Sequence, residues 1–175
     1  MIQKYIYGDP IETDAVIKEI PTSEGHPSYG TISTQDGFSF TYIMQPEDIV
    51  YGLGESNRGI NKRGFLYVSN CTDEPNHTED KQSLYGAHNF IIVDGINHSF
   101  GLFVDYPTNL TFDIGYTRQD TLSITCADAD LKLYVIDGSD AYDITRQFRH
   151  IIGRSYIPPR FAFGFGQSRW GYEKP

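Results

Sequence analysis

The sequence predicts an all-β protein built as an antiparallel β-sandwich or barrel. Three observations favour this class: short runs of β-branched and aromatic residues recur along most of the chain, Asp-Gly pairs adjoin some of these runs, and one segment alone has a helical pattern. With 13 Tyr, 11 Phe and 39% hydrophobic residues, the chain of 175 residues is too apolar to be disordered. A chain of this length buries enough surface to fold without a disulfide or a metal.

Eight runs are predicted to form strands. They are Phe38–Met44, Ile49–Leu53, Phe65–Ser69, Phe90–Val93, Phe100–Tyr106, Leu110–Ile114, Leu122–Thr125 and Leu131–Ile136. Leu131–Val135 alternates along its length, which indicates one exposed face, whereas Phe90–Val93 is apolar throughout, as expected for a strand covered on both faces. Asp36-Gly37 and Asp94-Gly95 predict two hairpins, because Asp-Gly supplies the positive φ angles of tight turns.

One amphipathic helix is predicted from about Asp140 to Ile152. Its apolar residues fall on one face at helical spacing: Ala141, Ile144, Phe148, Ile151 and Ile152. Ser139 or Asp140 can cap its start, two basic residues suit the negative end of its dipole, and Gly153 can close it.

The chain changes character after this helix. Pro158-Pro159 excludes helix and predicts an extended linker, which is the one persuasive boundary in the sequence. Residues 161–166 then have the pattern of a buried strand close to the last residue. Two interpretations stay open from the pattern: an edge strand that returns to the sandwich, or the beginning of another domain.

Composition argues against several partners and compartments. The formal net charge of −9 and the lack of a long basic run argue against nucleic acid as a partner. No apolar stretch approaches the ~20 residues that span a bilayer, so we expect no membrane partner. The first residues do not resemble a signal peptide, which predicts a cytoplasmic protein and makes Cys71 and Cys126 buried thiols rather than a disulfide.

The polar segment from Asn70 to Asp80 is the candidate site that the residues themselves suggest. Long segments without apolar periodicity between strands are uncommon unless they are functional. Its carboxylates could accept hydrogen bonds from sugar hydroxyl groups, although the composition alone favours a solvated acidic loop. The histidines and cysteines lack the spacing of metal ligands, so we expect no metal and no cofactor.

Five segments, in this order, carry a family resemblance. They are Tyr51–Glu55, Asn61–Gly64, Tyr85–Phe90, Gly101–Asp105 and Phe163–Tyr172. With these segments the chain strongly resembles family 31 glycoside hydrolases, and it looks closest to the α-glucosidases of gut bacteria. The resemblance runs from about Phe38 to the last residues.

The resemblance implies a galactose mutarotase-like sandwich over residues 1–158, followed at 159–175 by a linker and the first strand of a (β/α)8 barrel whose remainder is missing. It implies a retaining α-glucosidase acting on oligosaccharides, with both catalytic aspartates on later barrel strands and none in this chain. Asp73, in a loop that helps form the sugar pocket, and Trp170, at the end of the first barrel strand, are the expected substrate contacts. Gln167 and Arg169 are expected to be structural as readily as sugar-binding.

The resemblance also implies a partner, the missing barrel, and the surface that faces it. Phe161, Phe163 and Phe165 would be exposed without the barrel, so the chain is expected to associate with itself through this edge. Other functions stay open: an α-xylosidase or transglycosidase of the same family, a free-standing carbohydrate-binding sandwich, or a small sugar-epimerising enzyme of mutarotase type.

Overall fold

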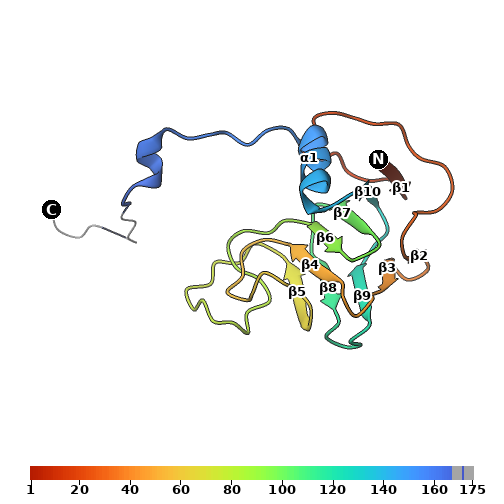
Figure 1. Ribbon diagram of the computed structural model, residues 1–175, viewed down its shortest axis with the longest axis horizontal. Coiled ribbons are helices and arrows are strands. Elements are labelled where there is room, and N and C mark those ends of the chain that lie inside the picture. The colour runs from red at the N-terminus through yellow and green to blue at the C-terminus, as the bar shows by residue number, and fades with distance from the viewer. Residues whose placement is uncertain (167–170, 172–175) are drawn as a thin grey trace.

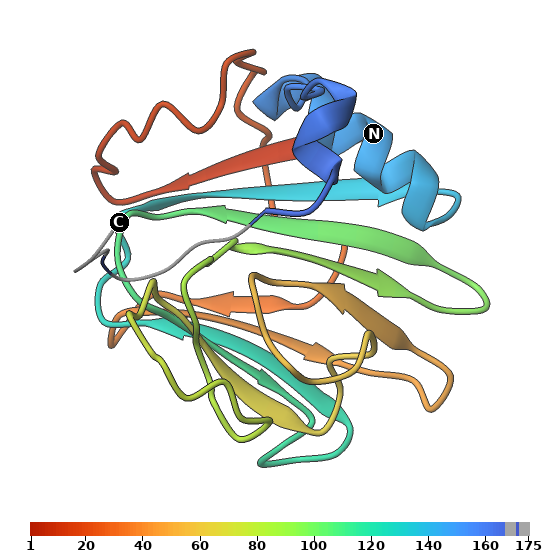
Figure 2. The same cartoon turned by 90° about the vertical axis from the view of Figure 1, so that its left-hand side faces the viewer.

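The computed structural model describes residues 1–166 and 171, and this part of the chain forms two five-stranded sheets packed face to face (Figures 1 and 2). The first sheet has the order β1 (Ile2–Tyr7), β10 (Leu131–Gly138), β7 (Ser99–Asp105), β6 (Phe90–Asp94) and β4 (Ile49–Gly52). The second has the order β2 (Thr31–Ser33), β3 (Phe38–Ile43), β9 (Thr121–Cys126), β8 (Leu110–Ile114) and β5 (Phe65–Ser69). All neighbouring strands pair antiparallel, which confirms the predicted sandwich.

All eight predicted runs are strands in the structure, and two further strands were not predicted. The turn that contains Gly37 connects β2 to β3, and Gly37 has a φ of 87°, as the Asp-Gly pair predicted. The second predicted hairpin also forms, between β6 and β7, but Gly95 does not adopt a positive φ. Glycine is needed there for space, because a Cβ atom on Gly95 would lie 2.4 Å from Oδ1 of Asp48.

The main core lies between the two sheets. Alternate residues of the strands point into it and are fully buried, among them Phe38, Phe40, Leu102, Phe112 and Leu133. Aromatic and aliphatic side chains from both sheets fill the space, so this core alone removes a large apolar area from water and stabilises the sandwich.

The helix α1 (Ala141–Ile152) covers the outer face of the first sheet (Figure 2). The Asp140 carboxylate caps its first turn by accepting a hydrogen bond of 2.8 Å from the amide of Asp143, and Gly153 ends it with a φ of 92°. Phe148 stacks on Phe90 of β6 with their ring centroids 3.8 Å apart. The predicted bounds, cap and buried face of the helix are confirmed.

Residues 9–24, which we call the strap, cover the rest of this outer face. Glu12 receives hydrogen bonds of 2.6 and 2.7 Å from the ammonium group of Lys132, and Glu19 pairs with Lys4. Lys4 and Lys132 are only 7% and 4% exposed. The expectation of an exposed face on β10 is therefore wrong, because the strap and α1 bury both faces of that strand and supply carboxylates to its lysine.

The segment after α1 departs from the prediction in part. Residues 153–159 have no regular structure, in agreement with the expected linker, but residues 161–166 are not a buried strand. A 3-10 helix, η1 (Arg160–Phe163), forms where the predicted strand would begin. Phe161, Phe163 and Phe165 are 83%, 74% and 98% exposed. A buried strand needs neighbours to pair with, and no described strand pairs with this segment.

The two cysteines are free, as predicted, but neither is fully buried. Cys71 is exposed, because it lies in a loop rather than in a strand. Cys126 is half-buried at the end of β9, and burial raises the pKa of its thiol to about 11. Of the two, Cys71 is therefore the thiol open to solution reagents.

Candidate functional site

The candidate loop, Asn70–Asp80, belongs to the long connection between β5 and β6 and projects from one side of the sandwich (Figure 1). Hydrogen bonds close its base. The amide of Thr72 donates to the carbonyl of Leu84 at 2.8 Å, and the hydroxyl groups of Thr72 and Ser83 lie 2.9 Å apart. The loop is therefore an ordered projection that returns to its own base before β6 begins.

Arg58 holds the far end of the candidate loop. Its guanidinium group donates to the carbonyl oxygens of Glu79 at 2.7 Å and Asp80 at 3.1 Å, and a third bond of 2.9 Å goes to the carbonyl of Leu66. The same group lies over the rings of Phe65 and Tyr67, at 4.3 and 5.0 Å from their centroids. Three directed bonds and two aromatic contacts use the planar fork of arginine, which lysine cannot reproduce.

An ion pair shapes the middle of the loop. Lys81 donates to Glu74 at 2.8 Å, and the amide of Asn76 donates to the other carboxylate oxygen at 2.9 Å. The hydrogen bond from Lys81, followed by that from the Asn76 amide, holds the pKa of Glu74 below its ordinary value. The bond to Glu74 in turn raises the pKa of Lys81. Glu74 is thus engaged within the loop.

Asp73 differs from its neighbour in having no such engagement. It is exposed, and no hydrogen bond or ion pair joins its carboxylate to the described part of the chain. An ionised, unengaged carboxylate at an ordered position can accept hydrogen bonds from a ligand without first breaking others. Trp170, Gln167 and Arg169 lie outside the described residues.

A groove begins at the base of the loop and runs across the sandwich to α1. Three adjoining cavities of about 310, 370 and 450 Å³ make it up. We call it the Phe103 groove and define it by Asn70, Cys71, Tyr106, Ala87, His88, Asn89, Ala15, Phe103, Leu53, Phe90, Phe148 and Ile152. Asn89 lines all three cavities, and the polar end of the groove lies near the loop while the apolar end lies beside α1.

Two polar side chains that line the groove, Asn89 and Asp105, are held by hydrogen bonds within the fold. The amide group of Asn89 donates to the carbonyl of Tyr106 at 3.1 Å and accepts a bond from the hydroxyl of Ser69. Asp105, which is 5% exposed, accepts a bond from the hydroxyl of Thr13 in the strap. Sequence reasoning missed this groove because six separate segments of the chain form it, and only the fold brings them together.

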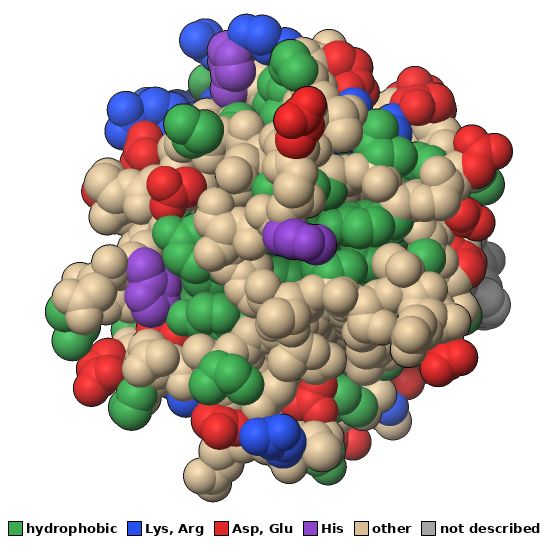
Figure 3. All heavy atoms as spheres, turned by 90° about the vertical axis from the view of Figure 1, so that its right-hand side faces the viewer, with side chains coloured by type: hydrophobic (Ala, Val, Ile, Leu, Met, Phe, Trp, Pro, Cys, Tyr) green, Lys and Arg blue, Asp and Glu red, His purple; other side chains and the backbone are tan. Residues whose placement is uncertain are grey.

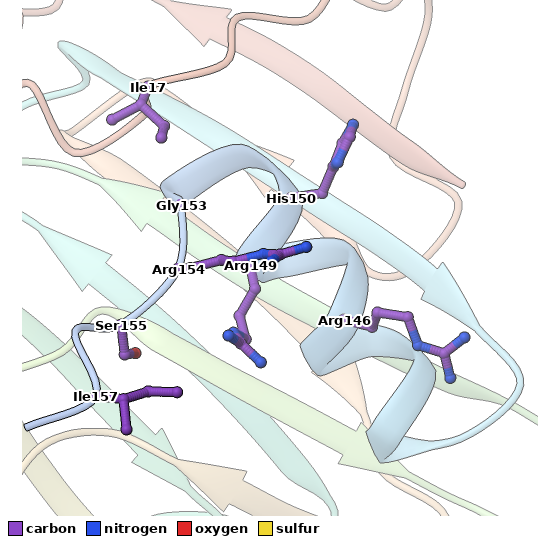
Figure 4. A pocket seen from close by; sticks show the side chains of 8 residues that line it. All are labelled: Ile17, Arg146, Arg149, His150, Gly153, Arg154, Ser155 and Ile157. Atoms are coloured by element: carbon purple, nitrogen blue, oxygen red, sulfur yellow. The ribbon is translucent and has the colours of Figure 1, made fainter.

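A basic cavity of about 660 Å³ lies at the end of α1 (Figure 4). Arg146 and Arg149 come from the helix, Arg154 comes from the segment after it, and Ile17 comes from the strap. Among the described residues, no carboxylate lies within ion-pairing distance of these three arginines. On the face that Figure 3 shows, acidic side chains lie along much of the edge, and lysine and arginine side chains gather mainly at the top and upper left.

A buried polar cluster lies away from the loop, at the turns beside β4 and β7. Asp48 is 2% exposed and accepts bonds from the Tyr42 hydroxyl at 3.0 Å and from the Gln45 amide at 2.8 Å. His98 Nε2 lies 2.7 Å from the Tyr42 oxygen and 3.3 Å from Asp48 Oδ1. Burial and the bond to Asp48 raise the pKa of Tyr42. The bonds to Asp48 all go to Oδ2, while Oδ1 has no hydrogen-bond partner among the described residues and lies near His98 alone. The contacts among the three side chains tie the turns together, which indicates a structural role.

The described residues contain neither a cluster of metal-ligating side chains nor a membrane-spanning helix. No group of three or more His, Cys, Asp or Glu side chains has the arrangement of a metal site. No helix in this part of the chain has the length and apolar character needed to cross a membrane.

Comparisons with known proteins show which sequences this chain is similar to. Residues 18–113 match the family model described as "Glycosyl hydrolase 31 N-terminal galactose mutarotase-like domain". Alpha-glucosidase 2 of Bacillus thermoamyloliquefaciens is 30% identical over 146 residues, covering 78% of this chain and 18% of the relative. Alpha-xylosidase XylQ of Lactiplantibacillus pentosus is 26% identical over 121 residues, covering 69% of this chain and 15% of the relative.

Solved structures show the same fold. The GH31 dextranase of Flavobacterium johnsoniae, complexed with glucose, superposes with a TM-score of 0.67 at 23% identity, covering 77% of this chain and 16% of the dextranase. This chain therefore spans less than a fifth of the length of these three similar proteins.

Proposed function

Because the chain belongs to the family of glycosyl hydrolase 31 N-terminal galactose mutarotase-like domains, we propose that it is the amino-terminal sandwich of a larger retaining α-glucosidase that releases terminal α-linked glucose from oligosaccharides. The observation that carries the proposal is the 30% identity with an α-glucosidase over 78% of this chain. Residues 1–158 form the sandwich, and residues 159–175 lead into the catalytic barrel. The catalytic aspartates belong to that barrel, so the chain has no turnover by itself.

In this proposal the candidate loop shapes the part of the pocket that receives the leaving sugar. Asp73 is the residue that contacts a sugar hydroxyl group, supported by its exposed carboxylate on a loop fixed by Arg58. Trp170 provides an apolar wall beside the ring. A rigid loop on a separate domain can set the preference for linkage and chain length, while the barrel holds the reacting carboxylates roughly 5 Å apart.

The test uses the polypeptide translated through to its natural stop codon. Release of nitrophenol from an aryl α-glucoside is measured for that protein and for the 175-residue chain, and activity in the longer protein only is expected. In the longer protein, Asp73→Asn should raise KM for isomaltose or maltose, because a sugar contact is lost. Glu79→Gln, which removes the same charge from the same loop, is the matched control. An unchanged KM for Asp73→Asn would contradict the role of Asp73.

An α-xylosidase is the second candidate, favoured by the 26% identity with XylQ over 69% of this chain. An aryl α-xyloside in the same assay distinguishes it, since an α-xylosidase should prefer the substrate that lacks the hydroxymethyl group. Two other functions have their own tests. Saturable heat in a calorimetric titration of the 175-residue chain with maltose would indicate a free-standing binding module, and accelerated mutarotation in a polarimeter would indicate an epimerase.

Two further expectations accompany the proposal. The exposed Phe161, Phe163 and Phe165 support self-association of the chain when it is separated from its barrel. Sedimentation at several concentrations, with Phe163→Ser and Phe165→Ser together as the comparison, tests this. We propose the cytoplasm as the compartment, which cell fractionation can test.

A further inference from the structure

We propose that the Phe103 groove and the arginines at the end of α1 form the docking surface for the catalytic domain that follows the sandwich. This inference rests on the proposed function, because that function supplies the domain that occupies the surface. It names the side of the sandwich, the residues that make the contact and the chemistry of the partner surface.

The apolar end of the groove is suited to burial against a partner. Phe90, Phe103 and Phe148 form its floor, and Leu53 and Ile152 line its sides. Apolar side chains that surround an open cavity gain free energy when a partner removes them from water. Leu53 has a φ of 63°, which is uncommon for a residue other than glycine, and the fold keeps this backbone at the groove with a 2.8 Å bond from its amide to the Phe90 carbonyl.

The path of the chain identifies the occupant. Ile152 lines the groove, and the chain leaves the helix at the next residue, Gly153. The exiting segment and the candidate loop extend to the same side of the sandwich (Figure 1). The family model describes an N-terminal domain, and the similar proteins are more than five times longer than their matched region. A domain that follows this sandwich would therefore begin from a segment that leaves beside the groove. A tethered domain has a high effective concentration at a site next to its tether, so even a modest surface suffices.

The basic cavity specifies the charge of the partner surface. In Figure 4 the Arg149 side chain extends toward Ser155 and Ile157, whereas Arg146 extends away from them. Guanidinium groups that spread apart fit several carboxylates on a surface better than they fit one small anion. We therefore expect acidic residues of the catalytic domain to face Arg149 and Arg154, next to apolar residues that enter the groove.

The opposite end of the groove gives the docking a functional consequence. Asn70 and Cys71 line this end and also begin the candidate loop. A domain that occupies the groove from α1 to Asn70 therefore meets the base of the loop that carries Asp73. Docking would then fix the distance between the loop and the mouth of the barrel.

The experiment measures the accessibility of the groove in two lengths of the protein. Ala15→Cys places a thiol in the groove, and Tyr142→Cys places one at the opposite end of α1, where Tyr142 is 85% exposed. Both are made with Cys71→Ser, in the 175-residue chain and in the polypeptide translated to its natural stop codon. We expect labelling of Ala15→Cys by a maleimide to be about tenfold slower in the longer protein, with Tyr142→Cys unchanged, because docking must open before a buried thiol reacts.

Charge reversal tests the arginines. Arg149→Glu in the longer protein should restore fast labelling of Ala15→Cys, whereas Arg118→Glu, an exposed arginine in the β8–β9 turn, should not. Equal labelling in both lengths would overturn the inference. So would labelling in the 175-residue chain that slows as its concentration rises, because a second copy would then occupy the groove. Protection of the groove with an unchanged KM for Asp73→Asn would refute the sugar contact and leave the docking surface supported.

Discussion

Replacement of Arg58 by alanine should release the far end of the candidate loop without unfolding the sandwich. Arg58 donates the bonds to the carbonyl oxygens of Glu79 and Asp80, which lie in the candidate loop. Its third bond goes to the carbonyl of Leu66, which lies in β5 and outside that loop. The change therefore removes two contacts that bind the loop to the sandwich. The hydrogen bonds at the base of the loop, including the one from the Thr72 amide to the Leu84 carbonyl, still form in the closed loop, but they open more often once Arg58 no longer holds it.

The size of the effect follows from these two bonds. Both join a charged donor to a neutral carbonyl near the surface, for which about 1 kcal/mol each is a suitable value. The loss of about 2 kcal/mol should increase the population of the open loop about 30-fold, since 1.4 kcal/mol corresponds to a factor of ten. The aromatic contacts of Arg58 involve β5 and its neighbour, so they contribute to local packing rather than to loop closure.

Native-state hydrogen exchange measures this opening directly. The Thr72 amide should exchange about 30-fold faster in Arg58→Ala, with the amides of β10 little changed, because the opening is local. Arg58→Lys keeps the charge but loses the fork, so it should give most of the same increase. Unchanged exchange at Thr72, or an equal acceleration in β10, would refute the assignment of Arg58 as the residue that positions the loop.

Three further predictions concern stability and titration. Asp48→Ala should lower the free energy of unfolding by about 1–3 kcal/mol in a urea titration, because it leaves two part-buried donors, the Tyr42 hydroxyl and the Gln45 amide, without this acceptor; a change below about 0.5 kcal/mol would contradict this. Gly101→Ala should cost about 1–3 kcal/mol in the same assay, because the new Cβ atom would lie 2.7 Å from Cγ2 of Ile144; wild-type stability would show that α1 moves aside freely. The Glu74–Lys81 pair should stabilise the loop above the ordinary Glu pKa of 4.5 and lose this contribution as the pH falls through the lowered pKa of Glu74. An NMR titration of Glu74 tests this, with Lys81→Met expected to bring its midpoint back toward 4.5.

The strands that the sequence predicted are those whose residues pack into the central core. Phe65–Ser69 and Leu110–Ile114 match their predicted bounds, because turn-forming residues flank both runs: Gly64 and Asn70 beside the first, Asn109 and Gly115 beside the second. The first strand was missed even though Ile2–Tyr7 also contains such residues. Its Lys4 points to the covered face of the sheet, and only the tertiary contact with Glu19 explains a lysine there.

The site could be predicted only in part, for a related physical reason. The candidate loop stands out in the sequence because its polar composition interrupts two strand patterns. Arg58 does not stand out, because its partners are main-chain carbonyl groups, which every residue provides. The Phe103 groove depends on the side-by-side arrangement of the strap, β6 and α1, and the order of strands in a sandwich cannot be read from their patterns.

The pairing of β1 with β10 has a consequence for synthesis of the protein. Ile2 lies opposite Ile136, so β1 leaves the ribosome well before β10, the strand with which it pairs. Such a long-range contact forms late, since the intervening chain must be ordered first. While β10 is still being translated, β1 and the strap lack the strand on which they pack, and Lys4, which is buried in the folded protein, remains in water. The nascent sandwich therefore closes in one late step, after residue 138 has emerged from the ribosome.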